Sequence, residues 1–168
     1  PTVLVAGIAS PIVEELVFRK VLLERLRAYG DVIAILVSGL CFGFYHGNIA
    51  QFLYASALGF IFAYVVIRTG KLRYSIALHI CINLLGTAIL PQVIQLGTMA
   101  TMLVGMAVIG FIMLGLILFA LAIALKKLKF EKGEIALEHP FKTVWFNAGM
   151  ILFVLISLAS FVVVALTV

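Results

Sequence analysis

Charged side chains are scarce in this sequence: Asp, Glu, Lys and Arg together make up 11% of its 168 residues. A water-soluble domain carries about 25% charged residues, because its surface must face water. Hydrophobic residues reach 65%, and the mean hydropathy is +1.28. The shortage of charge excludes an ordinary soluble domain and predicts an integral membrane protein.

Cysteine is equally rare, with only Cys41 and Cys81, each inside an apolar run. Two such residues do not make the framework of a disulfide-stapled secreted domain, and we interpret both as small buried hydrophobic residues. The sequence also lacks the basic stretch and small-residue cleavage site of a secretory signal. It begins at Pro1 without a methionine, so we expect a segment of a longer chain that lacks N-terminal helices.

The apolar residues form long continuous runs, without the every-second-residue alternation that is typical of membrane strands. Open strand edges in lipid would also leave backbone amides unpaired. The sequence therefore predicts an all-α fold, a polytopic transmembrane helix bundle with a polar cavity. The six hydrophobic segments are 3–27, 32–46, 49–67, 74–90, 95–125 and 144–167.

The lengths of these segments differ in what they allow. A membrane-spanning helix needs about 20 residues, which segments 49–67 and 144–167 meet directly. Segment 95–125 is longer and must tilt, bend or break. Segment 32–46 is short, and it either spans a thinned region or forms a buried hairpin with 49–67.

The basic residues indicate the sidedness of the chain. All twelve fall at three places, and alternating spans put those three places on one side of the membrane. The positive-inside rule makes that side cytoplasmic. The net charge of +5 is therefore a topology signal, and we predict no nucleic-acid partner. The three groups are Arg19, Lys20, Arg25 and Arg27; Arg68, Lys71 and Arg73; and Lys126, Lys127, Lys129, Lys132 and Lys142.

Small residues recur at intervals of four in segment 49–67, at Ala55, Gly59 and Ala63. Such a stripe lets a second membrane helix approach closely. We predict a packing role for these three residues.

Ionisable residues inside apolar segments are costly and are functional candidates by default. Glu15 and Arg19 are four residues apart and share one helix face, which predicts an ion pair. Glu14 is rotated by about 100° from Glu15 on a helix, so it points elsewhere and is a candidate general base. The alternative is a structural ion pair beside one spare acid.

Two further places carry polar groups at membrane depth. His46 ends segment 32–46, four residues after Phe42, and by itself it could simply cap a helix. His79 and Asn83 project from one helix face, about 6 Å apart along the axis. They could hold an interhelical hydrogen bond or donate to a developing oxyanion. Counted from the predicted cytoplasmic ends, all of these residues and Glu14 could meet near mid-membrane.

Taken together, these residues resemble the CPBP family, the CAAX prenyl protease and bacteriocin-processing (Abi) intramembrane proteases. The pattern is Glu-Glu-x-x-x-Arg, then Phe-x-x-x-His, then His-x-x-x-Asn on successive helices. The resemblance covers about 8–90 of an expected single domain over 1–168, with 95–125 and 144–167 as accessory helices. The matching positions are Glu14, Glu15, Arg19, Phe42, His46, His79 and Asn83.

The resemblance implies hydrolysis of a peptide bond inside the membrane. It implies that Glu14 and His46 activate a water molecule, and that His79 and Asn83 stabilise the oxyanion. Glu15 and Arg19 would then shape the site. Members of the family are also described as metalloproteases, in which case Glu14, His46 and His79 would bind a divalent metal such as zinc. Metal-dependent and metal-free glutamate catalysis both stay open.

The expected substrate is a membrane-associated protein or peptide, either a prenylated CAAX-type C-terminus or a bacteriocin in maturation or self-immunity. Membrane lipid is the other expected partner, and a bacterial plasma membrane the expected location. Two alternatives use the same buried polar residues. One is a membrane transporter with a proton relay, and the other is a non-catalytic immunity protein that acts by binding.

Overall fold

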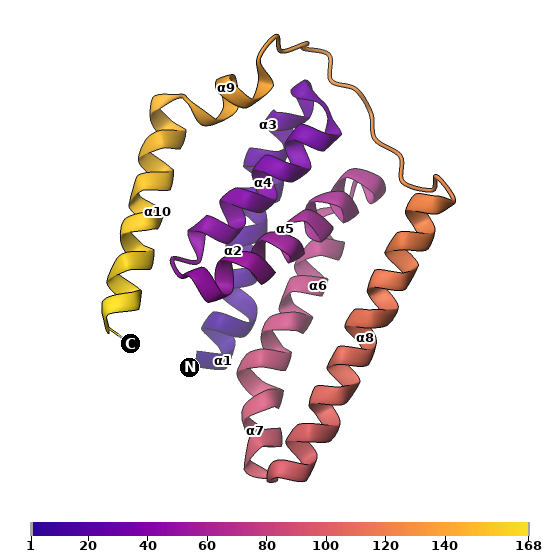
Figure 1. Ribbon diagram of the computed structural model, residues 1–168, viewed down its shortest axis with the longest axis vertical. Helices are drawn as coiled ribbons and strands as arrows, with labels where there is room; N and C mark the ends of the chain where they lie inside the picture. The colour runs from indigo at the N-terminus through magenta and orange to yellow at the C-terminus, as the bar shows by residue number, and fades with distance from the viewer. Residues whose placement is uncertain (1, 168) are drawn as a thin grey trace. The chain divides into compact units, whose positions relative to one another are not determined.

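Helices joined by turns make up most of the chain, and residues 125–139 form a long non-helical connection (Figure 1). The structure is a computed structural model that describes residues 2–167, without the side chains of residues 2, 140 and 141. Within that range the only β-type contact is an isolated bridge between Gly30 and Lys132. The predicted all-α fold is confirmed. Two compact units divide the described chain. Unit 1 comprises the residues up to Pro11 and Ile80–Phe130, and unit 2 comprises Ile12–His79 and the residues from Glu131 onward.

The first hydrophobic segment is one continuous helical run with two π-helical stretches. π-Helical turns are rare and frequently lie at functional sites, and the longer stretch here begins directly after Glu15 and includes Arg19. The run therefore changes its winding where the sequence places its carboxylates. In order, its parts are α1 (Thr2–Leu4), π-helical Val5–Ala9, α2 (Ser10–Glu15), π-helical Leu16–Leu23, α3 (Glu24–Leu26) and a 3₁₀ turn, Arg27–Tyr29.

Helices α4 (Asp31–Tyr45) and α5 (Ile49–Thr69) form a closely packed pair in unit 2. They meet at glycine: a Cβ on Gly59 would lie 2.8 Å from the Cα of Gly39 and 3.0 Å from its carbonyl oxygen. Ala55 and Ala63 are buried on the same stripe of α5. The packing role predicted for this stripe is confirmed. The short turn between the helices ends at Asn48, whose side chain accepts a hydrogen bond from the Gln51 amide at 2.8 Å.

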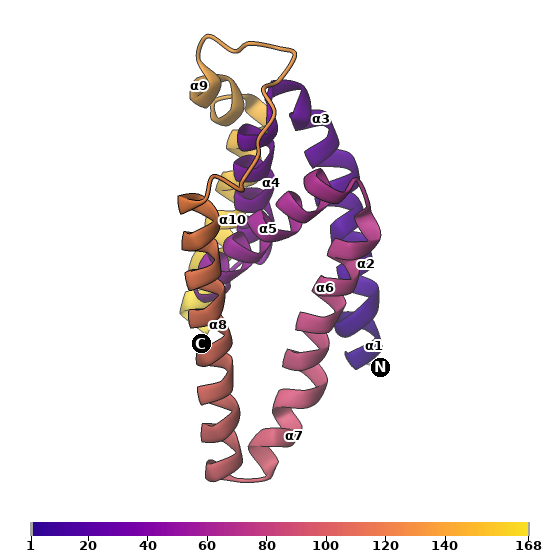
Figure 2. The same cartoon turned by 90° about the vertical axis from the view of Figure 1, so that its right-hand side faces the viewer.

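Aromatic side chains fill the core of unit 2. The rings of Phe18 and Phe42 meet edge to face with centroids 5.3 Å apart, an arrangement that aromatic pairs prefer. The hydroxyl of Ser38 donates to the Phe18 carbonyl at 2.9 Å and ties the first helical run to α4. Helix α10 (Ala148–Thr167) packs on α4 in the same unit, and Figure 2 shows the two side by side in a second view.

The segment that precedes α9 (Pro140–Trp145) is fastened to the start of α4. Asp31, 2% exposed, accepts from the Arg27 Nε at 3.2 Å and from the Glu131 amide at 2.9 Å. The Asp31 amide in turn donates to the Glu131 carbonyl at 3.1 Å. A Cβ on Gly133 would overlap the backbone at Tyr29. Both a glycine and a carboxylate are therefore needed for this contact.

Unit 1 exposes many large apolar side chains. A π-helical stretch, Leu85–Ile89, joins α6 (Leu72–Leu84) to α7 (Leu90–Gln95), and α7 meets α8 (Thr98–Ala124) at a tight turn (Figure 2). Helix α8 is unbroken over 27 residues, and none of its described side chains is buried. Cys41 is buried, as interpreted from the sequence, but Cys81 is exposed, so that interpretation was wrong for Cys81. An exposed thiol on an apolar helix is explained by a lipid surrounding.

Among residues 2–167, four helical segments are long and apolar enough to cross a membrane, and the chain is an integral membrane protein. Helix α4, at 15 residues, is shorter, and an ideal helix of that length spans only about 22 Å. Most of its side chains are buried, against α5, the first helical run and α10. The four segments are Ile49–Thr69, Leu72–Gln95, Thr98–Ala124 and Ala148–Thr167.

Candidate active site

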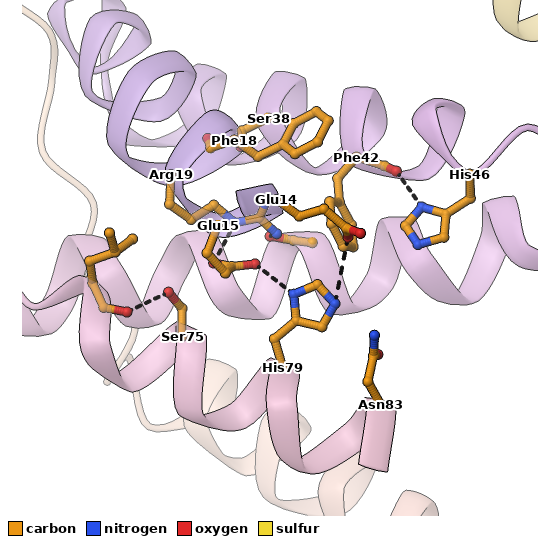
Figure 3. Close-up of polar contacts among 12 residues, drawn as sticks. Glu14, Glu15, Phe18, Arg19, Ser38, Phe42, His46, Ser75, His79 and Asn83 are labelled. Atoms are coloured by element: carbon orange, nitrogen blue, oxygen red, sulfur yellow. Dashed lines mark hydrogen bonds and ion pairs between the residues drawn. The ribbon is translucent and has the colours of Figure 1, made fainter. Parts of the chain in front are cut away.

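Unit 2 brings both carboxylates of the first motif to the imidazole of His79 (Figure 3). Glu15 and Arg19 are fully buried, and Glu14 and His79 are less than a tenth exposed. The three elements that supply these side chains are separated by up to 65 positions in the sequence. A buried cluster of ionisable groups in an apolar protein is costly unless its members pair, so the arrangement of the pairs decides what the site can do.

Glu15 and Arg19 form the ion pair that their spacing predicts, with Nε and Oε2 3.4 Å apart. The guanidinium is held from two other directions. Its Nη2 donates to the Gly59 carbonyl at 3.3 Å, and its central carbon lies 4.6 Å from the centroid of the Phe42 ring. A guanidinium over an aromatic face is a favourable cation–π contact. Arg19 therefore connects the first helical run to both α4 and α5.

His79 lies between the two acidic residues. Its Nδ1 is 3.1 Å from Oε1 of Glu15, and its Nε2 is 3.7 Å from Oε2 of Glu14. Both carboxylates of the motif thus face one imidazole, each from a different side of the ring. Sequence spacing alone related Glu15 to Arg19 and gave no partner for His79.

Aromatic rings enclose the imidazole of His79. The Phe62 ring stacks on it with centroids 5.1 Å apart and planes inclined by 30°. The Phe42 ring meets it edge to face at 5.4 Å. The same Phe42 ring contacts the ring of His46 at 4.8 Å. Phe42 is therefore in contact with both histidines. It lies four residues before His46, which is about one helical turn, so the two side chains share one face of α4.

His46, at the end of α4, has its Nδ1 2.8 Å from the carbonyl oxygen of Phe42. A carbonyl only accepts hydrogen bonds, so Nδ1 is the donor and the proton of a neutral imidazole sits there. Nε2 then carries a lone pair. The helix-capping interaction considered from the sequence is thus present, and it leaves the other ring nitrogen available as an acceptor.

The comparison with known proteins agrees with this constellation. Residues 1–85 match the family described as type II CAAX prenyl endopeptidase Rce1-like, and all seven motif positions fall inside that match. The chain belongs to this family. It is also 33% identical over 82 residues to "Putative membrane peptidase YdiL" of Bacillus subtilis (strain 168). That alignment covers 48% of this chain and 34% of the relative, so the chain spans about a third of the relative's length. No solved structure matches the chain significantly.

Asn83 of the Rce1-like chain belongs to unit 1. Its Nδ2 donates to the carbonyl of Ala6 at 2.9 Å, and its own backbone carbonyl accepts from the Thr87 hydroxyl at 2.7 Å. The interhelical hydrogen bond considered from the sequence is therefore present. The role of Asn83 as an oxyanion donor stays a prediction.

The metal set that the resemblance implies is not assembled. Among the side chains that the structure describes, no three or more from His, Cys, Asp and Glu lie where they could hold one ion together. Nε2 of His79 lies 3.7 Å from Oε2 of Glu14, whereas the Nδ1 of His46 faces a carbonyl. These residues do not fit a three-ligand site as placed, and the mechanism proposed below uses protein side chains alone.

Two contributors to the site were not recognised from the sequence. Phe62 stacks on His79, and the carbonyl of Gly59 accepts from Arg19. Phe62 lies in a continuous apolar run, where nothing in the residue pattern distinguishes it from a lipid-facing neighbour. Gly59 was assigned to packing, which is correct, but close packing is also what brings its carbonyl within reach of a guanidinium.

Proposed function

We propose that this Rce1-like chain is an intramembrane endopeptidase that hydrolyses a peptide bond in a membrane-associated protein or peptide. The observation that carries the proposal is the imidazole of His79 held between Glu14 and Glu15 in the interior of unit 2. Positioned acid–base groups of this kind typically contribute about 10²–10⁴-fold to a rate. Membership of a family described as endopeptidases supports the same reaction.

In the proposed reaction, a water molecule attacks the carbonyl carbon of the scissile bond. Glu14 accepts one proton of the water, assisted by the bare Nε2 of His46, and negative charge develops on the carbonyl oxygen. The carbon–nitrogen bond then breaks, and the departing nitrogen takes the proton. One carboxylic acid and one amine result, and a proton that passes between them gives a carboxylate and an ammonium, so atoms and charge balance. His79 and Asn83 act on the oxyanion, and Glu15 with Arg19 holds the site in shape.

A CAAX-type substrate, a prenylated C-terminus, is the class that the family description favours. Bacteriocin maturation or self-immunity is the other class expected from the sequence. The proposed location is a bacterial plasma membrane with the three basic connections on the cytoplasmic side. Mass spectrometry of membrane peptides from cells with and without active protein separates the two substrate classes, because the cleaved termini identify the substrate.

The reaction is tested with purified Glu14→Ala and His46→Ala proteins in detergent. Both are expected to stay folded and to lose cleavage of a prenylated peptide by at least about 100-fold, the size of a lost acid–base group. Glu24→Gln is the matched control, because Glu24 pairs with Lys20 on the exposed side of the same helical run. Full activity in either alanine variant ends the proposal.

A further inference from the structure

The two ring nitrogens of His79 face different carboxylates at different distances. This difference bears on which nitrogen carries the proton. Nδ1 is 3.1 Å from Glu15, within hydrogen-bond distance, whereas Nε2 is 3.7 Å from Glu14. Which imidazole nitrogen carries the proton is set by the hydrogen bond that the other one makes. The shorter contact, between Nδ1 and the fully buried carboxylate of Glu15, therefore decides which nitrogen of the ring carries the proton.

Glu15 can accept a hydrogen bond from His79 because its two carboxylate oxygens have separate partners. Oε2 faces the Arg19 guanidinium at 3.4 Å, and Oε1 faces Nδ1 of His79. A carboxylate that faces a guanidinium through one oxygen accepts hydrogen bonds through the other. The Nδ1 of His79 is consequently the donor in this contact.

The ring of His79 is also prevented from turning over. Phe62 covers one of its faces and the edge of Phe42 closes the side, so a flip that exchanged Nδ1 and Nε2 would have to displace both rings. Such displacement is costly in a close-packed interior. Geometry and hydrogen bonding thus favour the same orientation.

We propose that Glu15 is a positioning residue that fixes His79 with a proton on Nδ1, so that Nε2 is the atom presented to Glu14 and to the reacting group. This inference rests on the proposed function and assigns a specific role within it. With Nδ1–H committed to Glu15, only Nε2 of His79 faces the reaction, and it donates to the oxyanion when it carries a proton as well, since both nitrogens of a protonated imidazole are donors. His46 is oriented in the same way by the Phe42 carbonyl, which engages its Nδ1 and leaves its Nε2 to accept a proton from the water.

The proposal distinguishes Glu15 from a residue that only stabilises the fold. Replacing the orienting carboxylate of a catalytic histidine by an amide keeps the geometry and loses the tautomer, with a large loss of kcat, in the serine-protease triad. An amide at position 15 can donate to Nδ1 as well as accept from it. The Nδ1–H tautomer of His79 is then no longer favoured over the Nε2–H tautomer, and kcat is expected to fall without a change in KM.

The test combines a spectroscopic and a kinetic measurement on the full chain in detergent micelles. Histidine labelled with ¹⁵N reports directly which ring nitrogens carry protons, and His79→Gln identifies the His79 signals. Wild-type protein is expected to show a protonated Nδ1 at His79. Glu15→Gln is expected to lose that signature and to lower kcat by about 100-fold or more, with KM within twofold. Glu15→Asp, which keeps the carboxylate, is expected to restore part of both.

Glu24→Gln makes the same chemical change at an exposed position of the same helical run and is expected to alter neither measurement. An unprotonated Nδ1 at His79 in the wild-type protein overturns the proposal, even if no Glu15 variant folds. Unchanged kcat and unchanged His79 signals in Glu15→Gln overturn it as well. Absence of cleavage by the wild-type protein would refute the peptidase function, while the spectra would still decide the position of the proton.

Discussion

Removing Arg19 should destabilise the fold far more than removing an exposed cation from the same helical run. Arg19 and Glu15 are both fully buried, and Arg19→Met would leave the Glu15 carboxylate without its counter-charge. Breaking a buried pair in this way typically costs about 3–5 kcal/mol. Methionine keeps much of the apolar contact with Phe42 because its chain is long and flexible. The loss is therefore electrostatic and should lie near about 4 kcal/mol.

The assay is thermal unfolding in detergent, followed with a thiol-reactive dye. Cys41 is buried and becomes reactive on unfolding, whereas Cys81 is already exposed and would react in the folded state. A Cys81→Ser background therefore gives a clean signal. For a chain of this size the expected fall in Tm is about 10 °C.

Two further variants test the physical reason. Lys20→Met removes a cation whose partner, Glu24, is about half exposed, and such pairs contribute only about 0–1 kcal/mol. The double variant Glu15→Gln with Arg19→Met removes both buried charges and should recover at least half of the lost stability. A fall in Tm no larger for Arg19→Met than for Lys20→Met would refute the reasoning, as would additive losses in the double variant.

Other predictions follow from close contacts elsewhere. Gly59→Ala should lower the free energy of unfolding by about 1–3 kcal/mol through overpacking against Gly39. Gly105→Ala should not destabilise the protein, because nothing lies within 4 Å of its added carbon. Equal Tm values for the two variants would contradict this prediction. Asp31→Ala should free the segment at Glu131. Limited proteolysis should then cleave residues 131–138 faster than in wild type, and an unchanged rate would show that Asp31 does not hold that segment.

The sequence allowed the local part of the site to be predicted. Glu15 and Arg19 pair because residues four apart share a helix face whatever surrounds them. Ala55, Gly59 and Ala63 pack closely for the same reason, since small side chains at that spacing leave one face bare. Phe42 contacts His46 across one helical turn. The first and last of these contacts join residues that are four positions apart in the chain. The packing of the small residues requires only that some second helix be present.

Contacts between distant residues could not be predicted in this way. The carboxylate partners of His79 are more than 60 positions away. The contact between Glu14 and His79 was not expected, and the joint role expected for Glu14 and His46 stays a prediction. Asn83 was expected beside these residues, and the hydrogen bond found for it is to Ala6 in unit 1. Helical periodicity gives the face on which a side chain lies but not the helix which that face meets.

The sequence by itself determined that this chain is a membrane helix bundle, because too little charge is present to cover a water-exposed surface. It also determined which residues could carry chemistry, since ionisable groups in apolar helices are rare. Only the tertiary structure decided that both Glu14 and Glu15 face His79 and that Arg19 lies against Phe42. Those choices depend on how helices rotate and slide against one another, as close packing at Gly39 and Gly59 decides it for α4 and α5.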